Sequence, residues 1–266
     1  MNKISDIQNK IDDCISEMTP VSLADMKSIT LMNRTDTKYV LSVSLLAEML
    51  QLVRGDYNVQ EISGLRRVGY DTVYFDTPDM QMYASHLEGR KVREKIRVRS
   101  YLATNQTYIE VKNKTSDGRT MKRRLEVAGA DALQTKKVGR FMKANAWFSL
   151  DEIEPALRTT FRRITLVNKA MTERLTIDTD VVFSNLRNGV NTQLPHVAIV
   201  EIKRDGGAES PMNSVLRKEK VDEAGFSKYC VGCALTDESL RMGRIEKKLR
   251  KLAKINVLTD LYKSVR

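Results

Sequence analysis

The sequence has no long hydrophobic run. No stretch of about 18 consecutive apolar residues occurs in it, so we expect no transmembrane helix. The first residues are also unlike a secretion signal, because Asp6, Asp12 and Asp13 interrupt them and no basic, apolar leader is present. These features predict a cytoplasmic protein.

Cysteine and histidine are both scarce. The three cysteines, Cys14, Cys230 and Cys233, make a poor disulfide framework. The two histidines, His86 and His196, lie far from the Cys230–Cys233 pair in sequence, so a zinc site would lack its remaining ligands. We interpret the cysteines as ordinary buried thiols, with metal or redox use of the pair as the less favoured alternative.

Several common functional motifs are absent as well. There is no Walker loop, nucleophile elbow, dinucleotide-binding glycine pattern or histidine-rich metal motif, which removes support from the usual phosphate-cradle and hydrolase mechanisms. Aromatic residues make up only 6% of the chain and form no stacking motif on the expected strands, so we expect no nucleic acid partner. The chemistry must therefore rest on charged side chains.

Positive charge is abundant. The 45 Lys and Arg residues exceed the 34 Asp and Glu residues, which leaves a net charge of +11. Such a charge attracts polyanions: nucleic acid, phosphorylated small molecules, polyphosphate or an anionic membrane. The hydrophobic content of 41% is enough for a core, and no linker rich in Gly, Ser or Pro divides the chain. We therefore expect one domain over residues 1–266, with its core at about 25–235.

Apolar residues at helical spacing predict helices near both ends of the chain. The first covers residues 3–18 and ends before Pro20, a second runs from an N-cap at Ser42 to Val53, and a third spans about 130–145. A basic amphipathic helix is expected at about 236–263. Its apolar stripe would dock on the body of the protein; binding to a membrane surface is the alternative.

The middle of the chain has the period-two alternation of β-strands. Strands are predicted at residues 68–75, 94–101, 106–114, 121–127, 160–167, 173–178 and 197–203. Turn residues at 104–105 and 116–118 make residues 94–127 a three-stranded meander. The expected fold class is α+β, with a mostly antiparallel sheet.

The alternation places ionic side chains on one face of each strand. The sets that share a face are Arg34, Asp36 and Lys38; Lys95, Arg97, Arg99 and Tyr101; Glu110, Lys112 and Lys114; Lys122, Arg124 and Glu126; Arg174, Thr176 and Asp178; and Glu201 and Lys203. A sheet whose polar face meets water is the simple explanation. However, cations two residues apart lie about 7 Å from each other and repel unless an anion lies between them. Closing the sheet with these faces inward would give a polar lumen covered by helices.

Acidic residues among these cations need their own explanation. Glu110, Glu126 and Glu201 cannot favour an anion directly, but Mg²⁺ or Mn²⁺ is held through one or two carboxylates together with phosphate oxygens. Ion pairing with neighbouring Lys and Arg is the alternative role.

Four stretches of the sequence resemble one known family. They are residues 34–39 (RTDTKY); residues 73–78 (VYFDTP) leading into 95–101 (KIRVRSY); residues 109–114 (IEVKNK) with 122–124 (KRR); and the late group 174–178 (RLTID), 200–203 (VEIK) and 226–229 (FSKY). Over about residues 25–235 the chain resembles the catalytic domain of the vacuolar transporter chaperone (VTC) family. These are polyphosphate polymerases within the triphosphate tunnel metalloenzyme superfamily.

The resemblance implies a fold and a set of binding residues. The fold would be an eight-stranded antiparallel β-barrel, or triphosphate tunnel, covered by helices. The residues that would contact phosphate are Lys38, Arg97, Arg99, Lys112, Arg124, Arg163, Arg174, Lys203 and Lys228, to which the alternation adds Lys114. Glu201 would be the leading metal ligand and Glu110 the second, and we expect the catalytic groups to be Arg97, Arg99, Lys112, Lys203 and Glu201.

The resemblance also implies a reaction. The terminal phosphoryl group of a nucleoside triphosphate, expected to be ATP, would pass to a growing polyphosphate end with Mn²⁺ or Mg²⁺ as cofactor, and pyrophosphate could act as primer. A tunnel triphosphatase and a non-catalytic polyphosphate binder are the alternatives. Asp36 stands where the family usually has Glu, and the glutamate-rich opening of the hydrolytic relatives is missing, which weakens the triphosphatase interpretation. No phosphate-sensing or membrane module accompanies the motifs, so a stand-alone prokaryotic form is expected.

Overall fold

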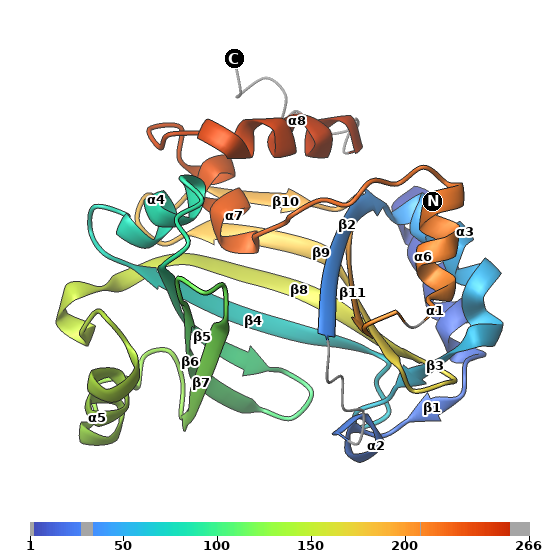
Figure 1. Ribbon diagram of the computed structural model, residues 1–266, viewed down its shortest axis with the longest axis horizontal. Helices are drawn as coiled ribbons and strands as arrows, with labels where there is room; N and C mark the ends of the chain where they lie inside the picture. The colour runs from blue at the N-terminus through green and yellow to red at the C-terminus, as the bar shows by residue number, and fades with distance from the viewer. Residues whose placement is uncertain (1–2, 28–33, 208, 256–266) are drawn as a thin grey trace.

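One curved antiparallel sheet organises the molecule (Figure 1). The computed structural model describes residues 3–27, 34–207 and 209–255. Along the sheet the order of the strands is β2 (Arg34–Ser42), β11 (Val197–Asp205), β9 (Glu173–Asn185), β8 (Glu154–Asn168), β4 (Arg67–Asp76), β5 (Arg93–Tyr101), β6 (Gln106–Lys114) and β7 (Thr120–Val127). The prediction of an α+β fold built on eight antiparallel strands is confirmed.

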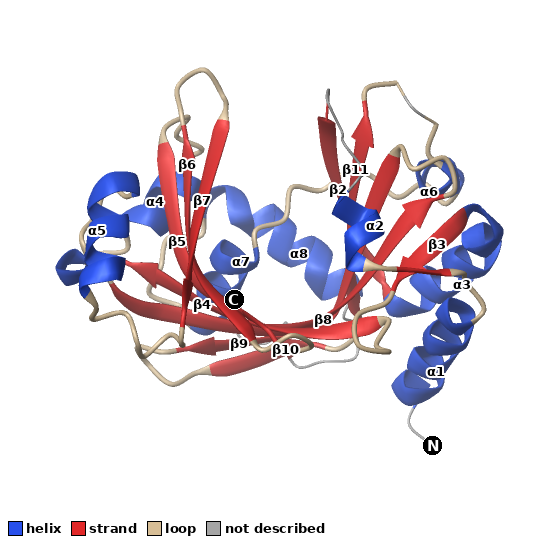
Figure 2. Cartoon of the chain, turned by 90° about the horizontal axis from the view of Figure 1, so that it is seen from below, coloured by secondary structure: helices blue, strands red, loops and turns tan. Residues whose placement is uncertain are grey.

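The sheet is bent into a trough (Figure 2). Strands β5, β6 and β7 form one wall, β4, β8 and β9 form the floor, and β2 and β11 form the other wall. Within the described residues the end strands β2 and β7 pair with other strands but not with each other, so the hydrogen-bonded ring stays open on one side. Three short strands extend the floor: β10 (Asn191–Leu194) beside β9, β3 (Tyr57–Gln60) beside β8, and β1 (Pro20–Val21), which pairs with β3 in parallel.

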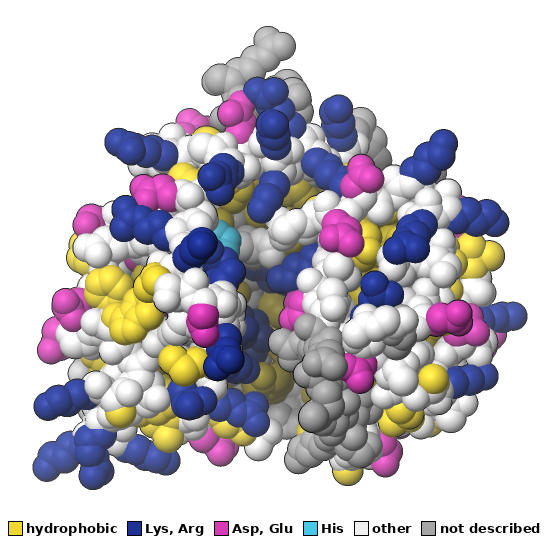
Figure 3. Space-filling model, viewed as in Figure 1, with side chains coloured by type: hydrophobic (Ala, Val, Ile, Leu, Met, Phe, Trp, Pro, Cys, Tyr) yellow, Lys and Arg dark blue, Asp and Glu magenta, His cyan; other side chains and the backbone are white. Residues whose placement is uncertain are grey.

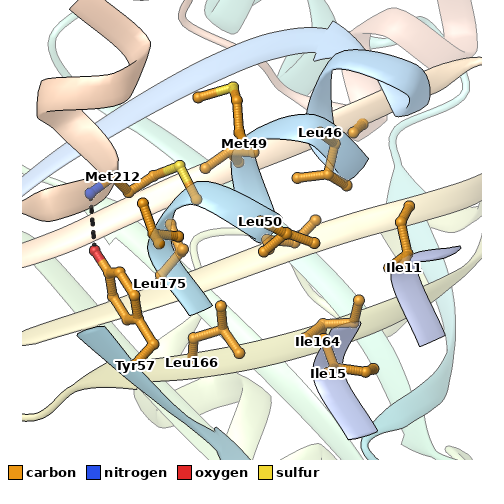
Figure 4. Close-up of a cluster of buried hydrophobic side chains, with 14 of the residues drawn as sticks. Ile11, Ile15, Leu46, Met49, Leu50, Tyr57, Ile164, Leu166, Leu175 and Met212 are labelled. Carbon is orange, nitrogen blue, oxygen red and sulfur yellow. Dashed lines mark hydrogen bonds between the residues drawn. The ribbon is translucent and has the colours of Figure 1, made fainter. Parts of the chain in front are cut away.

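Helices cover the outer face of the sheet at both walls. On the side of β2 and β11 lie α1 (Lys3–Ser16), α3 (Val43–Val53) and α6 (Pro211–Lys218). Their apolar side chains pack with Ile164, Leu166 and Leu175 of the floor strands (Figure 4). In the same cluster the Tyr57 hydroxyl accepts a hydrogen bond from the backbone N–H of Met212 at 3.1 Å, which ties β3 to the start of α6.

The opposite wall has its own cover. Helix α5 (Lys136–Asn145) buries Val138 and Met142 against Ile96 and Ile109, which point away from the trough. Helix α4 (Gln81–Leu87) follows β4, and the short α2 (Leu23–Lys27) lies near β1. Single 3-10 turns occur at Arg54–Asp56, Leu150–Glu152 and Gly243–Ile245. The expected outward direction of the apolar faces is therefore seen at both walls.

Two late helices lie across one end of the trough. Helix α7 (Lys228–Thr236) and helix α8 (Glu246–Ile255) pack on inward-facing apolar residues of the floor, among them Val181 and Phe183. Gly232 allows the close approach of α7, because a Cβ atom there would lie 2.5 Å from side-chain atoms of Leu157 and Phe183. One end of the trough is thus plugged by an apolar cluster.

The helix boundaries differ from the sequence expectations at three places, the first being α1, which ends at Ser16 and not at residue 18. Ser42 caps α3 as predicted, since its side chain accepts from the N–H of Leu45. Helix α5 starts later than expected, at Lys136, because Thr135 provides its N-cap. The basic C-terminal helix starts at Glu246 rather than near residue 236, and residues 256–263 of that prediction lie outside the described part of the chain. No helix among the described residues is long and apolar enough to cross a membrane.

Candidate functional site

Basic side chains gather in a hollow between the two walls of the trough (Figure 3). The strand register explains this. Lys95, Lys112 and Lys122 lie opposite one another across β5, β6 and β7, and Lys203 of the other wall lies opposite Arg174 of the floor strand β9. Because each strand alternates its faces, residues that lie opposite one another share a face, and in these strands it is the face that lines the trough.

The first wall is organised around Glu110, whose side chain is 0% exposed. The Arg97 guanidinium donates to its carboxylate at 2.7 Å and lies 2.6 Å from it through a second nitrogen, and Lys122 forms a further ion pair. Burial opposes ionisation of this acid, but the charges of Arg97 and Arg99 prevail and lower the pKa of Glu110 to about 2. Glu110 is therefore an anion that holds Arg97 in position.

Lys112 stands next to this group, and none of the described residues gives it a comparable anionic partner. The positive charge of Arg97, followed by burial and the charge of Lys122, lowers the pKa of Lys112 to about 6. Burial likewise lowers the pKa of Lys95, whose ammonium donates to the Ser227 hydroxyl at 2.9 Å. The wall thus holds more positive charge than its own carboxylate compensates, and a bound anion would complete the balance.

On the floor, Asp178 joins two cations from distant parts of the chain. Arg163 of β8 donates to both carboxylate oxygens of Asp178, at 2.5 and 2.7 Å. Lys228, the first residue of α7, forms an ion pair with the same carboxylate. Burial alone would raise the pKa of Asp178, yet the charges of Arg163 and Lys228 hold it well below its usual range. Lys228 also lies 4.4 Å from the centre of the Phe161 ring. The position at which α7 packs on the floor therefore places the Lys228 side chain in the trough.

Aromatic rings support the cations from below. The Arg99 guanidinium lies 5.6 Å from the centre of the Tyr70 ring and donates to the Thr72 hydroxyl at 3.1 Å. Arg97 lies 5.9 Å from the Tyr74 ring. These contacts favour a positive charge on a surface that is otherwise apolar. The sequence interpretation missed these rings, although Tyr70, Thr72 and Tyr74 share the inward face of β4 by simple alternation.

The second wall carries Glu201, which the sequence predicted as the leading metal ligand. Its oxygens lie 3.7 Å from the Lys38 ammonium and 3.5 Å from the Lys203 ammonium, both longer than a close hydrogen bond. Burial raises the pKa of Glu201, but the charges of Lys38 and Lys203 outweigh it and lower the pKa overall. Glu201 is thus an ionised carboxylate held only loosely by its neighbours.

These carboxylates could hold a metal ion only together with oxygen atoms of a bound phosphate compound. Glu110 and Glu201 lie on opposite walls, and the described residues contain no cluster of three or more His, Cys, Asp and Glu side chains able to hold a metal ion. Mg²⁺ is usually bound by one or two carboxylates plus substrate phosphates and water. Glu201 matches that pattern, whereas Arg97 and Lys122 compete with a metal for the oxygens of Glu110.

Three predicted residues remain: Arg124, Lys114 and Arg174. The exposed Arg124 stacks on the Tyr108 ring at 4.7 Å, and Lys114 lies at the end of β6, opposite Arg93. Arg174 donates to the backbone carbonyl of Met26. The structure therefore brings together Lys38, Arg97, Arg99, Lys112, Arg163, Lys203, Glu201 and Lys228. Of the others, Arg124 is exposed, Lys114 is the last residue of its strand, and Arg174 lies opposite Lys203 with its guanidinium on Met26.

Comparison with known families agrees with this arrangement. The family model of the VTC domain matches residues 33–236, which include all strands of the trough and α7. The chain belongs to the VTC domain family, as its motifs predicted. No similar protein was found among curated proteins.

Solved structures with a similar course of the chain are distant in sequence. A proposed adenylate cyclase of Vibrio parahaemolyticus is 11% identical, with a TM-score of 0.45 over 76% of this chain and 99% of the other. One from Bacillus halodurans is 14% identical, with a TM-score of 0.44 over 74% and 96% of the two chains. A proposed adenylyl cyclase from Hippeastrum, described as having a dominant triphosphatase activity, is 13% identical, with a TM-score of 0.44 over 76% and 96%.

Proposed function

We propose that this protein is a metal-dependent polyphosphate polymerase that transfers the terminal phosphoryl group of a nucleoside triphosphate, ATP foremost, to a growing polyphosphate chain. The observation that carries the proposal is the set of cations that both walls and the floor contribute to the trough: Arg97, Arg99, Lys112, Arg163, Lys203 and Lys228. Such a set of like charges favours a ligand with repeated negative charge. Membership of the VTC domain family supports the same conclusion.

In this reaction the phosphoryl group passes directly from the nucleotide to the acceptor, and no side chain of the protein has to form a covalent bond. The acceptor oxygen at the end of a polyphosphate chain is already an anion, so no general base is required. The bond between the γ-phosphorus and the bridging oxygen breaks, a new P–O bond to the acceptor forms, and the nucleoside diphosphate leaves. Catalysis then depends on alignment and on neutralising the phosphoryl oxygens.

The side chains divide this work by position. Arg97, held by Glu110, and Arg99, set against Tyr70, offer rigid guanidinium donors from the first wall. Lys203 and Glu201 face them from the second wall. Glu201 would hold Mn²⁺ or Mg²⁺ together with phosphate oxygens, and the metal when bound would supply further neutralisation of charge.

The test is synthesis by the purified full chain. We would incubate the protein with ATP and Mn²⁺ or Mg²⁺, with and without pyrophosphate, and stain gels for long polyphosphate. Arg97→Ala and Glu201→Gln should each lower the rate by about 10²- to 10³-fold. Two exposed residues outside the trough provide matched controls, Arg158→Ala and Glu246→Gln, and these should retain the rate.

Other outcomes would assign a different activity. Release of orthophosphate without long chains would indicate a tunnel triphosphatase, in which water replaces the acceptor phosphate. Tight polyphosphate binding without turnover would indicate a binding protein. Full activity in Glu201→Gln would remove Glu201 from the metal site.

A further inference from the structure

An aromatic pocket opens at the end of the trough opposite α7. It has a volume of about 260 Å³, and its walls include Tyr70, Tyr101 and Tyr108 together with Arg124. Tyr70 lies near the start of β4, whereas Tyr74, near the other end of that strand, contacts Tyr229 of α7 at a ring distance of 5.2 Å. We call this cavity the tyrosine pocket.

The rings of the tyrosine pocket are fixed by one another. Tyr101 meets Tyr70 edge to face at 5.2 Å and meets Tyr108 edge to face at 6.0 Å. Tyr70 is also stacked on Phe161 at 5.1 Å. Such mutual contacts hold the rings in place before a ligand arrives, which lowers the entropic cost of binding.

Cations of the proposed phosphate site touch these same rings. The Arg163 guanidinium lies 5.0 Å from the Tyr70 ring centre and Arg99 lies 5.6 Å from it, while Arg124 covers Tyr108 at 4.7 Å. A ligand in the tyrosine pocket would therefore lie next to the first cations of the trough. A fitting ligand has a flat apolar part and, a short distance from it, a run of phosphates.

Inorganic polyphosphate does not have the flat part. A chain of phosphates has no π-face to stack on the three tyrosine rings, so the aromatic lining favours a ligand that carries a base. A nucleobase does gain, because every base offers a π-face for stacking. The polar side chains of Gln60, Thr104 and Gln106 on the same walls can donate to and accept from the edge of a base.

We infer that the tyrosine pocket receives the base of the nucleoside triphosphate donor, with its phosphates directed toward Arg99 and Arg163. The inference rests on the proposed function in that it names the donor end of the same site. It also gives the trough a direction: the nucleoside remains at the aromatic end, and its terminal phosphate points toward α7.

The experiment compares a ligand with a base and one without. Dissociation constants of ATP and of inorganic tripolyphosphate would be measured by calorimetry at one ionic strength and Mg²⁺ concentration. Ala103→Trp fills the pocket from the turn between β5 and β6, and Tyr101→Leu removes one ring. Val190→Trp, at an exposed valine in the turn before β10, controls for a new surface tryptophan.

Both pocket variants should bind ATP about five- to tenfold more weakly than the wild type and bind tripolyphosphate unchanged. Val190→Trp should change neither constant. An equal loss for both ligands, or no loss for ATP in Ala103→Trp, would overturn the inference. If the differential loss is found but the wild type makes no polyphosphate, only the polymerase proposal fails; if polyphosphate is made without that differential loss, only the pocket assignment fails.

Discussion

Binding of polyphosphate should take up a proton at Lys112. In the free protein the charge of Arg97, with burial and the charge of Lys122, lowers the pKa of this ammonium to about 6. A phosphate chain in the trough adds negative charge beside Lys112, which favours the protonated form and moves its pKa back toward the ordinary value of about 10.4. At a pH between these two pKa values, the complex holds more protons than the free protein and the free ligand together.

The sign and size of the effect follow from this difference. Because the bound state holds the extra proton, affinity falls as pH rises above about 6, by at most about tenfold per pH unit, equivalent to about 1.4 kcal/mol. From about pH 6.5 to about pH 8.5 the loss should therefore approach, but not exceed, about 100-fold from this one group. Below about pH 6 the affinity should stop depending on Lys112, since both states are protonated.

Calorimetry in buffers of different ionisation enthalpy measures the proton uptake directly. The ligand's own ionisations cancel when the wild type is compared with Lys112→Gln at the same pH. The variant should show about one proton less near pH 7.5. Lys143→Gln, an exposed lysine of α5, provides the matched control and should behave as the wild type. Equal proton uptake in the wild type and in Lys112→Gln would refute the assignment.

Three further predictions concern stability, each measured by urea denaturation. Glu110→Gln leaves buried cations without their carboxylate and should lower the free energy of unfolding by about 3 kcal/mol, with partial recovery when polyphosphate is added; an unchanged midpoint would show that the pair adds nothing. Gly232→Ala places a Cβ 2.5 Å from its neighbours and should cost about 1–3 kcal/mol, whereas Gly139→Ala, in an open position of α5, should be neutral or slightly stabilising. Burial raises the pKa of Glu94 to about 7, so the folded state holds the extra proton and stability is lost as pH rises from about 4.5 to about 7; Glu94→Gln should flatten that slope, and an identical slope in the variant would contradict the assignment.

Most of the sheet could be predicted from the sequence because period two is a strong signal when one face is ionic. The prediction at 106–114 coincides with β6, and 94–101 differs from β5 by one residue. The charged sets of β5, β6 and β7 were correctly assigned to one shared face. Alternation cannot show how far the sheet closes, since the gap between β2 and β7 depends on the summed twist and tilt of the strands.

Two strands are longer than the sequence suggested, and a bulge explains why. The register of β8 and β9 shifts between Thr160 and Arg162, and Asp180 has a positive φ of 52°. Beyond that point the inward face continues with Val181 and Phe183, which contact α7 instead of the phosphate site. A fixed period of two predicted the end of the strand at residue 178, where the pattern changes phase.

The sequence predicted which cations belong to the candidate site, but it did not predict which side chains they contact. Asp178 was seen as one member of an ionic face, and nothing in the sequence shows that Arg163 and Lys228, 15 and 50 residues away, converge on it. That contact depends on where α7 packs. The tyrosine rings were likewise missed, because only the register of β4, β5 and β6 brings them together.

The basic residues at the open edge of the trough have a second role besides ligand binding. Strand β7 ends the sheet, and its backbone groups on one side have no neighbouring strand among the described residues. Lys122, Arg123 and Arg124 follow one another along this edge, and a row of like charges opposes the addition of a strand from another molecule. Substituting these residues to weaken ligand binding would also remove protection against edge-to-edge association. Sedimentation of such variants should therefore accompany any measurement of their affinity.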